Sequence, residues 1–166
     1  APQCFWGPGY ARAVEHPASE LTAVGGSWTT DYGKSFYQGW GDPGHTLTLP
    51  SFTAAATGEH LVQVAYGNGA GPINTGITCG VKLARIEDTS SGAVVGRGYL
   101  VMPQRGAWGS WGDSSFVRAS LTAGKTYRVV LADDASGRNM SDLLHFAAYT
   151  GGTGGSGGAF FRVNVA

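Results

Sequence analysis

QRGAWGSWGDSSFVRASLTAG, residues 104–124, joins an aromatic loop to a strand and ends in a turn. The glycine-rich loop carries Trp108 and Trp111, and the alternating residues 115–121 after it predict a half-buried β-strand. Two indole rings are costly to leave in water unless a flat partner stacks on them, and sugars and nucleobases are such partners. The alternative is that one or both rings fill the edge of the fold as core residues.

Strands of the same kind are predicted on both sides of this segment. Alternation is clear over residues 46–49 and 60–66, and it places Val62, Val64 and Tyr66 on one face. Further strands are expected at residues 10–15, 35–38, 79–87, 93–101, 126–132, 143–149 and 160–165. Turn residues such as those at 24–26, 91–92 and 123–124 separate them. Without a convincing helical period, the sequence predicts an all-β fold, a two-sheet antiparallel β-sandwich.

Length and charge limit the partners of this chain. The 166 residues suit a single domain, residues 1–166. Eleven basic and eleven acidic residues give a net charge of zero, which lacks the positive footprint of a protein that holds nucleic acid or an anionic membrane. No apolar run is long enough to span a bilayer. We therefore expect neither nucleic acid nor a membrane as partner.

The two cysteines, Cys4 and Cys79, indicate the compartment. An even pair in a chain with few lysines favours an extracellular disulfide, and the start Ala1-Pro2 suits a mature secreted terminus or a domain cut from a longer enzyme. The alternative is two unrelated buried thiols. We expect a secreted protein with a Cys4–Cys79 bond.

Catalytic motifs are weak. The four histidines lack zinc-site spacing, and the G-x-S-x-G match at residues 154–158 lies in a glycine run without the strand and helix of a nucleophile elbow. Eleven carboxylates leave open a glycosidase pair, so a small glycan-active hydrolase or lyase remains an alternative. A chain occupied in building its own sandwich has little length left for an enclosed cleft, and we expect no enzyme.

Several segments, in order, carry a family resemblance. They are VE at 14–15, KSFYQGWG at 34–41, VQVAYGN at 62–68, MP at 102–103 ahead of the tryptophan loop, and LTAGKTYRVVL at 121–131. The pattern resembles the carbohydrate-binding modules of families 6 and 35, with their galactose-binding-like jelly roll. The resemblance implies a non-catalytic module that binds a polysaccharide or oligosaccharide in a loop cleft and is attached to a polysaccharide-degrading catalytic domain.

By matching position, the resemblance also nominates residues. Aromatic rings would stack on the sugar, and a late asparagine would bind its hydroxyls, either Asn139 or Asn164, which stands nearer the end. The residues expected to contact carbohydrate are Tyr37, Trp40, Trp108, Trp111 and Asn139. Stacking on a neutral sugar should barely respond to salt, whereas strong salt dependence would indicate an acidic polysaccharide read by Arg105 or its neighbours.

The resemblance further implies a structural calcium ion near the first strand, where Glu15 matches the family's acidic ligand. The partner acid expected after the last strand is missing, because the chain stops at Asn164-Val165-Ala166. The segment NTGITC at 74–79 and the long stretch 139–158 also depart from the pattern, so the sugar is not carried over. The alternative function is a structural accessory β-sandwich of a glycoside hydrolase that binds no sugar.

Overall fold

The computed structural model describes residues 14–17, 20–31, 34–40, 44–68, 79–132, 150–151 and 160–165. These residues form strands and the turns between them. In chain order the strands are β1 (Val14–Pro17), β2 (Thr22–Val24), β3 (Ser27–Asp31), β4 (Lys34–Gln38), β5 (Thr46–Thr48), β6 (Phe52–Thr53), β7 (Gly58–Tyr66), β8 (Cys79–Asp88), β9 (Val94–Pro103), β10 (Gly112–Asp113), β11 (Val117–Leu121), β12 (Thr126–Ala132), β13 (Thr150–Gly151) and β14 (Phe160–Val165).

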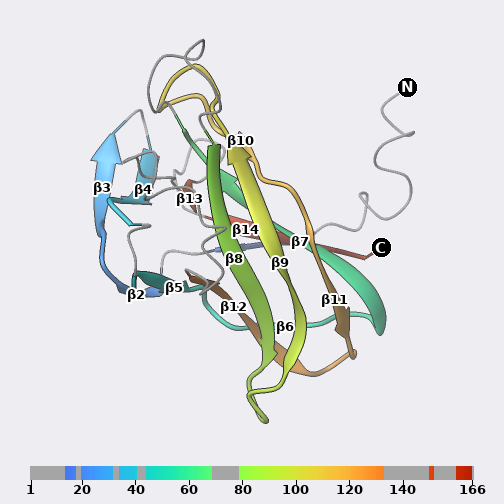
Figure 1. Cartoon of the computed structure of the whole chain (residues 1–166). Coiled ribbons are helices and arrows are strands. Elements are labelled where there is room, and N and C mark those ends of the chain that lie inside the picture. Colours follow the sequence, from blue (N-terminus) through green and yellow to red (C-terminus); the bar gives the residue numbers. More distant parts are fainter. Residues whose placement is uncertain are drawn as a thin grey trace, which may run out of the picture.

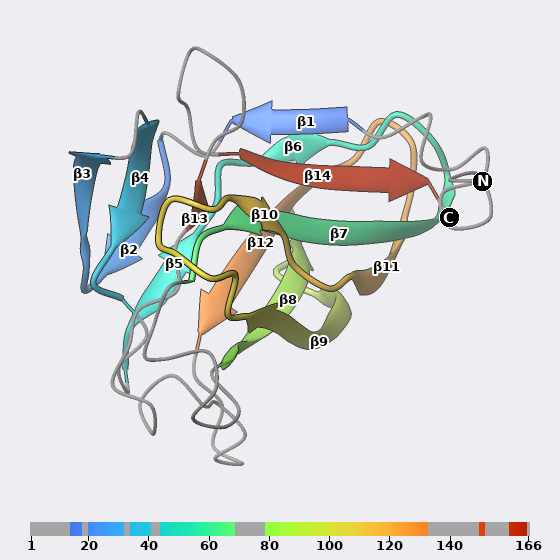
Figure 2. The same ribbon diagram turned by 90° about the horizontal axis from the view of Figure 1, so that it is seen from above.

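Two antiparallel sheets and a smaller third one make up the fold. The first sheet has the order β1-β14-β7-β10, with β11 also paired to β7, and the second has the order β2-β5-β12-β8-β9, with β6 paired to β12. The third sheet has the order β13-β4-β3. Figures 1 and 2 show the first two sheets packed face to face and the strands β3 and β4 at one side of them. The predicted all-β sandwich is confirmed.

The core lies between the first and second sheets. Val62, Val64 and Tyr66 of β7 are 1%, 0% and 1% exposed, so the face predicted for this strand is the one that packs inward. Apolar residues at alternate positions of β11 and β12 meet them from both sheets; these are Val117, Ala119, Leu121, Tyr127, Val129 and Leu131. The period of two in the sequence thus selects the face of each strand that enters this core, although Gln63 and Ala65 on the other face of β7 are also buried.

The third sheet was not expected as a separate unit. The predicted strand at residues 35–38 is β4, but β3 beside it was missed, and so were β2 and the short strands β6, β10 and β13. The turn predicted at residues 24–26 joins β2 to β3, with Gly25 and Gly26 at φ values of 84° and 79°, which favour glycine. The strand expected at 143–149 lies outside the described residues.

Asp88 ties two turns together at one end of the second sheet. Its Oδ1 accepts hydrogen bonds from Ser90 N at 2.9 Å and Ser90 Oγ at 2.7 Å, and its Oδ2 accepts one from Lys125 Nζ at 2.9 Å. The Asp88 backbone also closes the β8–β9 turn, through Gly92 N to Asp88 O and Asp88 N to Ala93 O, both at 2.8 Å. The hydrogen bonds from Ser90, followed by that from Lys125, lower the pKa of the Asp88 carboxyl well below its usual range.

We expect Asp88→Ala to lower the melting temperature at neutral pH, because it removes the acceptor shared by both turns. A carboxyl whose pKa is lower in the folded state stabilises the fold above its unfolded pKa of about 3.9, and this contribution is lost as the pH falls towards the folded-state value. Melting curves from neutral pH down to about pH 2 should therefore show the two proteins converging below about pH 4. A gap that stays constant across this range would contradict the role of the charge.

Candidate functional site

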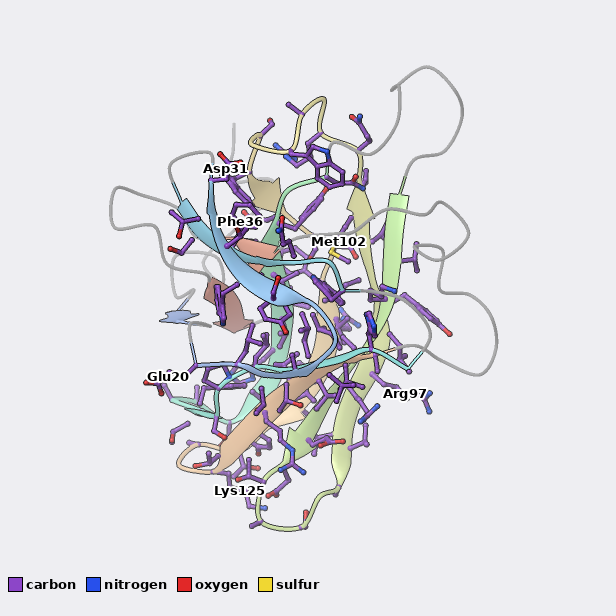
Figure 3. All side chains as sticks on the ribbon, turned by 90° about the vertical axis from the view of Figure 1, so that its left-hand side faces the viewer. Glu20, Asp31, Phe36, Arg97, Met102 and Lys125 are labelled. Atoms are coloured by element: carbon purple, nitrogen blue, oxygen red, sulfur yellow. The ribbon has the colours of Figure 1, made fainter. Side chains whose placement is uncertain are left out.

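Residues 104–111 form a loop that is folded on itself and fixed to the end of β7. The backbone N of Arg105 donates to the Asn68 carbonyl oxygen at 2.8 Å, and Arg105 Nε donates to the Ser110 carbonyl oxygen at 2.8 Å. Ser110 N donates to the Ala107 carbonyl oxygen at 3.2 Å, which closes a turn that contains Trp108. We call this segment the tryptophan loop. Asp31, Phe36 and Met102, labelled in Figure 3, lie at the same end of the molecule.

The strand ends beneath the tryptophan loop are fixed by buried polar groups. Asn68, at 0% exposure, donates from Nδ2 to the Met102 carbonyl oxygen at 3.0 Å, and the Tyr66 hydroxyl donates to the Pro103 carbonyl oxygen at 2.8 Å. Both bonds hold the last residues of β9 against the end of β7. The loop therefore starts from a fixed position, as a preformed binding loop requires.

Arg105 holds the tryptophan loop from within. Its guanidinium carbon lies 6.0 Å from the centroid of the Tyr66 ring, in the range of a cation–π contact, and the group packs directly on the backbone of Gly112. Together with the bond from Nε to Ser110, these contacts place the side chain against its own loop. The sequence analysis considered Arg105 as a contact to an acidic polysaccharide. The contacts of its side chain favour a role in positioning the tryptophan loop instead.

Trp111 joins the tryptophan loop to the third sheet. Its ring centroid lies 5.1 Å from that of Phe36 with a tilt of 57°, and Phe36 is 1% exposed. The half-buried indole also packs over Gly67, where an added Cβ would come within 3.1 Å of its Cζ3. The two rings touch, so no sugar fits between them in this structure.

Trp108 lies three residues before Trp111 on the tryptophan loop. It is half-buried, and its backbone carbonyl packs against Gly67, so the loop lies directly on β7 at this point. This close approach needs a glycine, because any side chain would collide with the Trp108 carbonyl. Trp108 is thus held at a fixed place on the loop with part of its surface in solvent.

Tyr37 and Trp40, two of the residues expected to contact carbohydrate, lie in the core. They are 7% and 2% exposed, and both belong to the central apolar cluster. The Tyr37 hydroxyl donates to the Gly25 carbonyl oxygen at 2.7 Å, and the Lys82 ammonium lies 5.8 Å from the Trp40 ring centroid. Neither ring offers a face to a ligand.

Trp28 on β3 is an aromatic residue that the sequence analysis missed. It is 39% exposed and meets the Tyr37 ring edge to face, with centroids 5.5 Å apart and planes at 83°. The register pairs Trp28 with Tyr37 and Thr30 with Ser35, which puts all four on one face of the β3–β4 hairpin. The exposed hydroxyls of Thr30 and Ser35 lie 3.1 Å apart. The signal available in SWTTD at 27–31 was its aromatic and β-branched residues, which favour strands, directly after two glycines.

The remaining predicted residues are not tested. Cys4 and Asn139 lie outside the described residues, and Glu15, Cys79 and Asn164 are described only as backbone positions of β1, β8 and β14. Among the side chains that the structure describes, no three acidic, histidine or cysteine residues gather as a metal site. The described residues also hold no helix of the length and apolarity that crossing a bilayer requires. The calcium site and the disulfide stay predictions.

Comparisons with known proteins give a fold. No protein-family model matches the sequence, and no curated protein matches it. Among solved structures, a family 35 carbohydrate-binding module from Clostridium thermocellum is similar at a TM-score of 0.59 and 15% identity, over 93% of this chain and 98% of that one. The C-terminal family 6 module of LamC from Zobellia galactanivorans is similar at a TM-score of 0.59 and 12% identity, over 92% and 98%.

A larger protein shares the same fold in part. A cycloisomaltooligosaccharide glucanotransferase from Paenibacillus sp., solved with cycloisomaltoheptaose, is similar at a TM-score of 0.62 and 16% identity over 92% of this chain. This chain spans only 18% of the length of that enzyme. The two isolated modules, in contrast, are matched over nearly their whole length. The chain therefore has the β-sandwich fold of the carbohydrate-binding modules of families 6 and 35.

Proposed function

We propose that this chain is a non-catalytic carbohydrate-binding module that binds its glycan by aromatic stacking. The observation that carries the proposal is the match, over nearly their whole length, to isolated modules of families 35 and 6. The exposed indole of Trp28 and the partly exposed indole of Trp108 support the stacking mode. Both lie on elements fixed by hydrogen bonds or ring contacts.

Stacking suits the chemistry of these rings. The apolar C–H face of a pyranose removes water from an indole face, and nearby hydroxyls give direction to the contact. Trp28 has such hydroxyls beside it, since Thr30 and Ser35 share its face of the β3–β4 hairpin. Trp108 is held on the tryptophan loop, so binding costs little conformational entropy at this residue.

The attachment and the compartment are part of the same proposal. The similar region of the Paenibacillus enzyme is a minor part of a longer chain, which supports a role in bringing an attached polysaccharide-degrading domain to its glycan. Secretion and a Cys4–Cys79 bond fit substrates that lie outside the cell. A polysaccharide or oligosaccharide is then the partner, and a structural calcium near Glu15 is a further proposal that chelation followed by a melting curve tests.

The decisive experiment is affinity electrophoresis of the purified chain in gels that contain neutral plant and microbial polysaccharides, run beside a reducing-sugar assay. Retardation by at least one neutral polysaccharide without release of reducing ends is the expected result. Release of reducing ends would show a glycan-active enzyme. A folded chain that no polysaccharide retards would show the structural accessory sandwich instead.

Trp28→Ala and Trp108→Ala test the stacking mode. Each should lower the affinity for the retained neutral polysaccharide by about tenfold or more, because removing an aromatic contact at an interface centre costs about 2 kcal/mol or more. Isothermal titration should show the same loss of affinity at low and at high salt concentration, since neither the indole ring nor the neutral sugar is charged. Melting temperatures should stay close to the parent's.

The matched control is Phe116→Ala. Phe116 is 37% exposed and directly precedes β11, so the variant removes an aromatic ring from the surface at another place. It should leave the affinity unchanged. If Trp28→Ala and Trp108→Ala both bind like the parent while folded, stacking at these residues is excluded and the glycan contacts lie elsewhere.

A further inference from the structure

The outer face of the second sheet carries a group of arginines. In the register of β8 and β9, Arg85 stands directly opposite Arg97, and in that of β12 and β8, Arg128 stands opposite Glu87. Arg85 and Glu87 are two residues apart on β8, so they share a face. Ala84 and Ile86 of the same strand belong to the core, which makes this the face away from the first sheet. We call Arg85, Arg97 and Arg128 the arginine cluster.

Glu87 organises two members of the arginine cluster. Arg85 Nε donates to Glu87 Oε2 at 2.8 Å, and Arg128 Nε donates to Glu87 Oε1 at 2.8 Å. The carboxylate is thus held from both sides, and its side chain is only 12% exposed, whereas those of Arg85 and Arg128 are 35% and 38% exposed. Both contacts use the inner nitrogen of the guanidinium, and each arginine carries two further nitrogens that bear donors.

The charges on this face do not balance. Among the described residues of β8, β9 and β12, Glu87 is the one acid on the outer face, against three arginines. Burial alone would raise the pKa of Glu87, but the hydrogen bonds and charges of Arg85 and Arg128 outweigh it and lower that pKa, so the carboxylate stays ionised. Even so, the group keeps an excess of two positive charges in a chain whose net charge is zero.

The pairing of Arg85 with Arg97 is the informative feature. Like charges directly opposite each other on neighbouring strands destabilise a sheet. Arg97 is exposed, and Figure 3 shows its side chain projecting away from the strands. An anion between the two guanidinium groups would relieve this repulsion, and guanidinium forks match carboxylate and sulfate oxygens in geometry.

Apolar side chains surround the base of the charged pair. One register step along the same face, Leu83 stands opposite Tyr99, next to Arg85 and Arg97 on their strands. Across the sheet, Val130 of β12 separates Arg85 from Thr48 of β5. Leu83 and Val130 are only 7% and 5% exposed, and Tyr99 is half-buried, so the charged pair stands beside a packed apolar layer that holds the arginine stems in place.

We propose that the arginine cluster, ordered by Glu87, is a second binding site, which takes the carboxylate or sulfate groups of an acidic polysaccharide. This site uses none of the aromatic residues proposed for stacking and lies on the other main sheet from β7. The acidic groups would bind between Arg85 and Arg97, with Arg128 as the third cation. The net charge of the whole chain is zero, so it does not indicate this local excess of positive charge.

Arg97→Gln tests the site, because Arg97 forms no ion pair with any side chain that the structure describes, and the change leaves the backbone of β9 intact. Affinity electrophoresis of the whole chain should use polygalacturonate, dextran sulfate and unmodified dextran. We expect the parent to be retarded by polygalacturonate, by dextran sulfate or by both, and Arg97→Gln to weaken this retardation about tenfold, as for the loss of a charged hydrogen-bonding group. The polymer that retards the parent identifies carboxylate or sulfate as the ligand chemistry.

The matched control is Arg118→Gln, which removes the same charge from an exposed position on β11 of the first sheet. It should leave the retardation unchanged, and equal weakening by both variants would show diffuse attraction instead of a site and overturn the proposal. Arg97→Lys should recover only part of the affinity, because lysine keeps the charge and loses the fork. A parent that neither acidic polymer retards overturns the proposal as well.

The aromatic variants separate this site from the proposed function. Trp28→Ala and Trp108→Ala should keep the full retardation by the acidic polymer, while Arg97→Gln should keep the full affinity for the neutral polysaccharide. Loss of acidic binding in the tryptophan variants would mean one shared site, which also overturns the proposal. If the parent binds the acidic polymer but no neutral polysaccharide, the proposed function fails and the arginine cluster is still supported.

Discussion

Trp40→Ala is expected to destabilise the protein by about 3–5 kcal/mol, the range for truncating a large buried aromatic residue. Trp40 is 2% exposed and belongs to the cluster that joins both main sheets to β4. Its removal leaves a cavity and takes away the ring over which the Lys82 ammonium lies, 5.8 Å from the centroid. The free energy of unfolding of a domain is about 5–15 kcal/mol, so denaturant unfolding should show a large part of this stability lost.

Trp40→Phe is the matched control. Among the described residues the buried Nε1 of Trp40 has no hydrogen-bond acceptor, and a buried donor without one costs about 1–3 kcal/mol. Phenylalanine keeps an aromatic ring and removes that donor, so it should cost much less than alanine. Glycan affinity of the folded fraction should be unchanged in both variants. A stable Trp40→Ala protein with lost glycan affinity would contradict the core placement and restore Trp40 as a ligand contact.

The contrast between Trp40 and Trp28 shows what the sequence predicts and what it leaves open. Strict alternation predicted the buried face of β7, because a period of two fixes which side chains share a face. Trp40 lies between two glycines, so no alternating pattern of apolar residues predicts which way its ring points. Its ring direction depends on Lys82 of β8 and on the apolar cluster, which are remote in the sequence.

The two proposed sites depend on strand pairing, which the sequence alone does not show. The β3 strand is short, polar and at the edge of its sheet, so its apolar pattern is weak, and only its pairing with β4 brings Trp28 beside Thr30 and Ser35. Likewise, the sequence shows arginines at 85, 97 and 128 but not that the register sets Arg85 against Arg97. The tryptophan loop was predicted as a loop, while the separate places of Trp108 and Trp111 within it follow from packing on Gly67 and Phe36.

Gly67→Ala should have the largest effect on glycan binding of any change that adds a single methyl group. The added Cβ would collide with the carbonyl oxygen of Trp108 and would come within 3.1 Å of the Trp111 ring. The backbone of the tryptophan loop must then move away from β7, and forcing extra volume into a packed site costs about 1–3 kcal/mol. Because Trp108 moves with the backbone, we expect the affinity for the neutral polysaccharide to fall by about tenfold or more.

Gly98→Ala separates a displaced loop from a general loss of stability. Gly98 lies on β9, where an added Cβ meets only Val117 side-chain carbons at 3.5 Å, an ordinary contact, so this variant should melt and bind like the parent. Isothermal titration and melting curves of both variants give the comparison. If Gly67→Ala binds the neutral polysaccharide at full affinity, the contacts of the tryptophan loop do not contribute to that binding, and Trp28 with its neighbouring hydroxyls must carry the site alone.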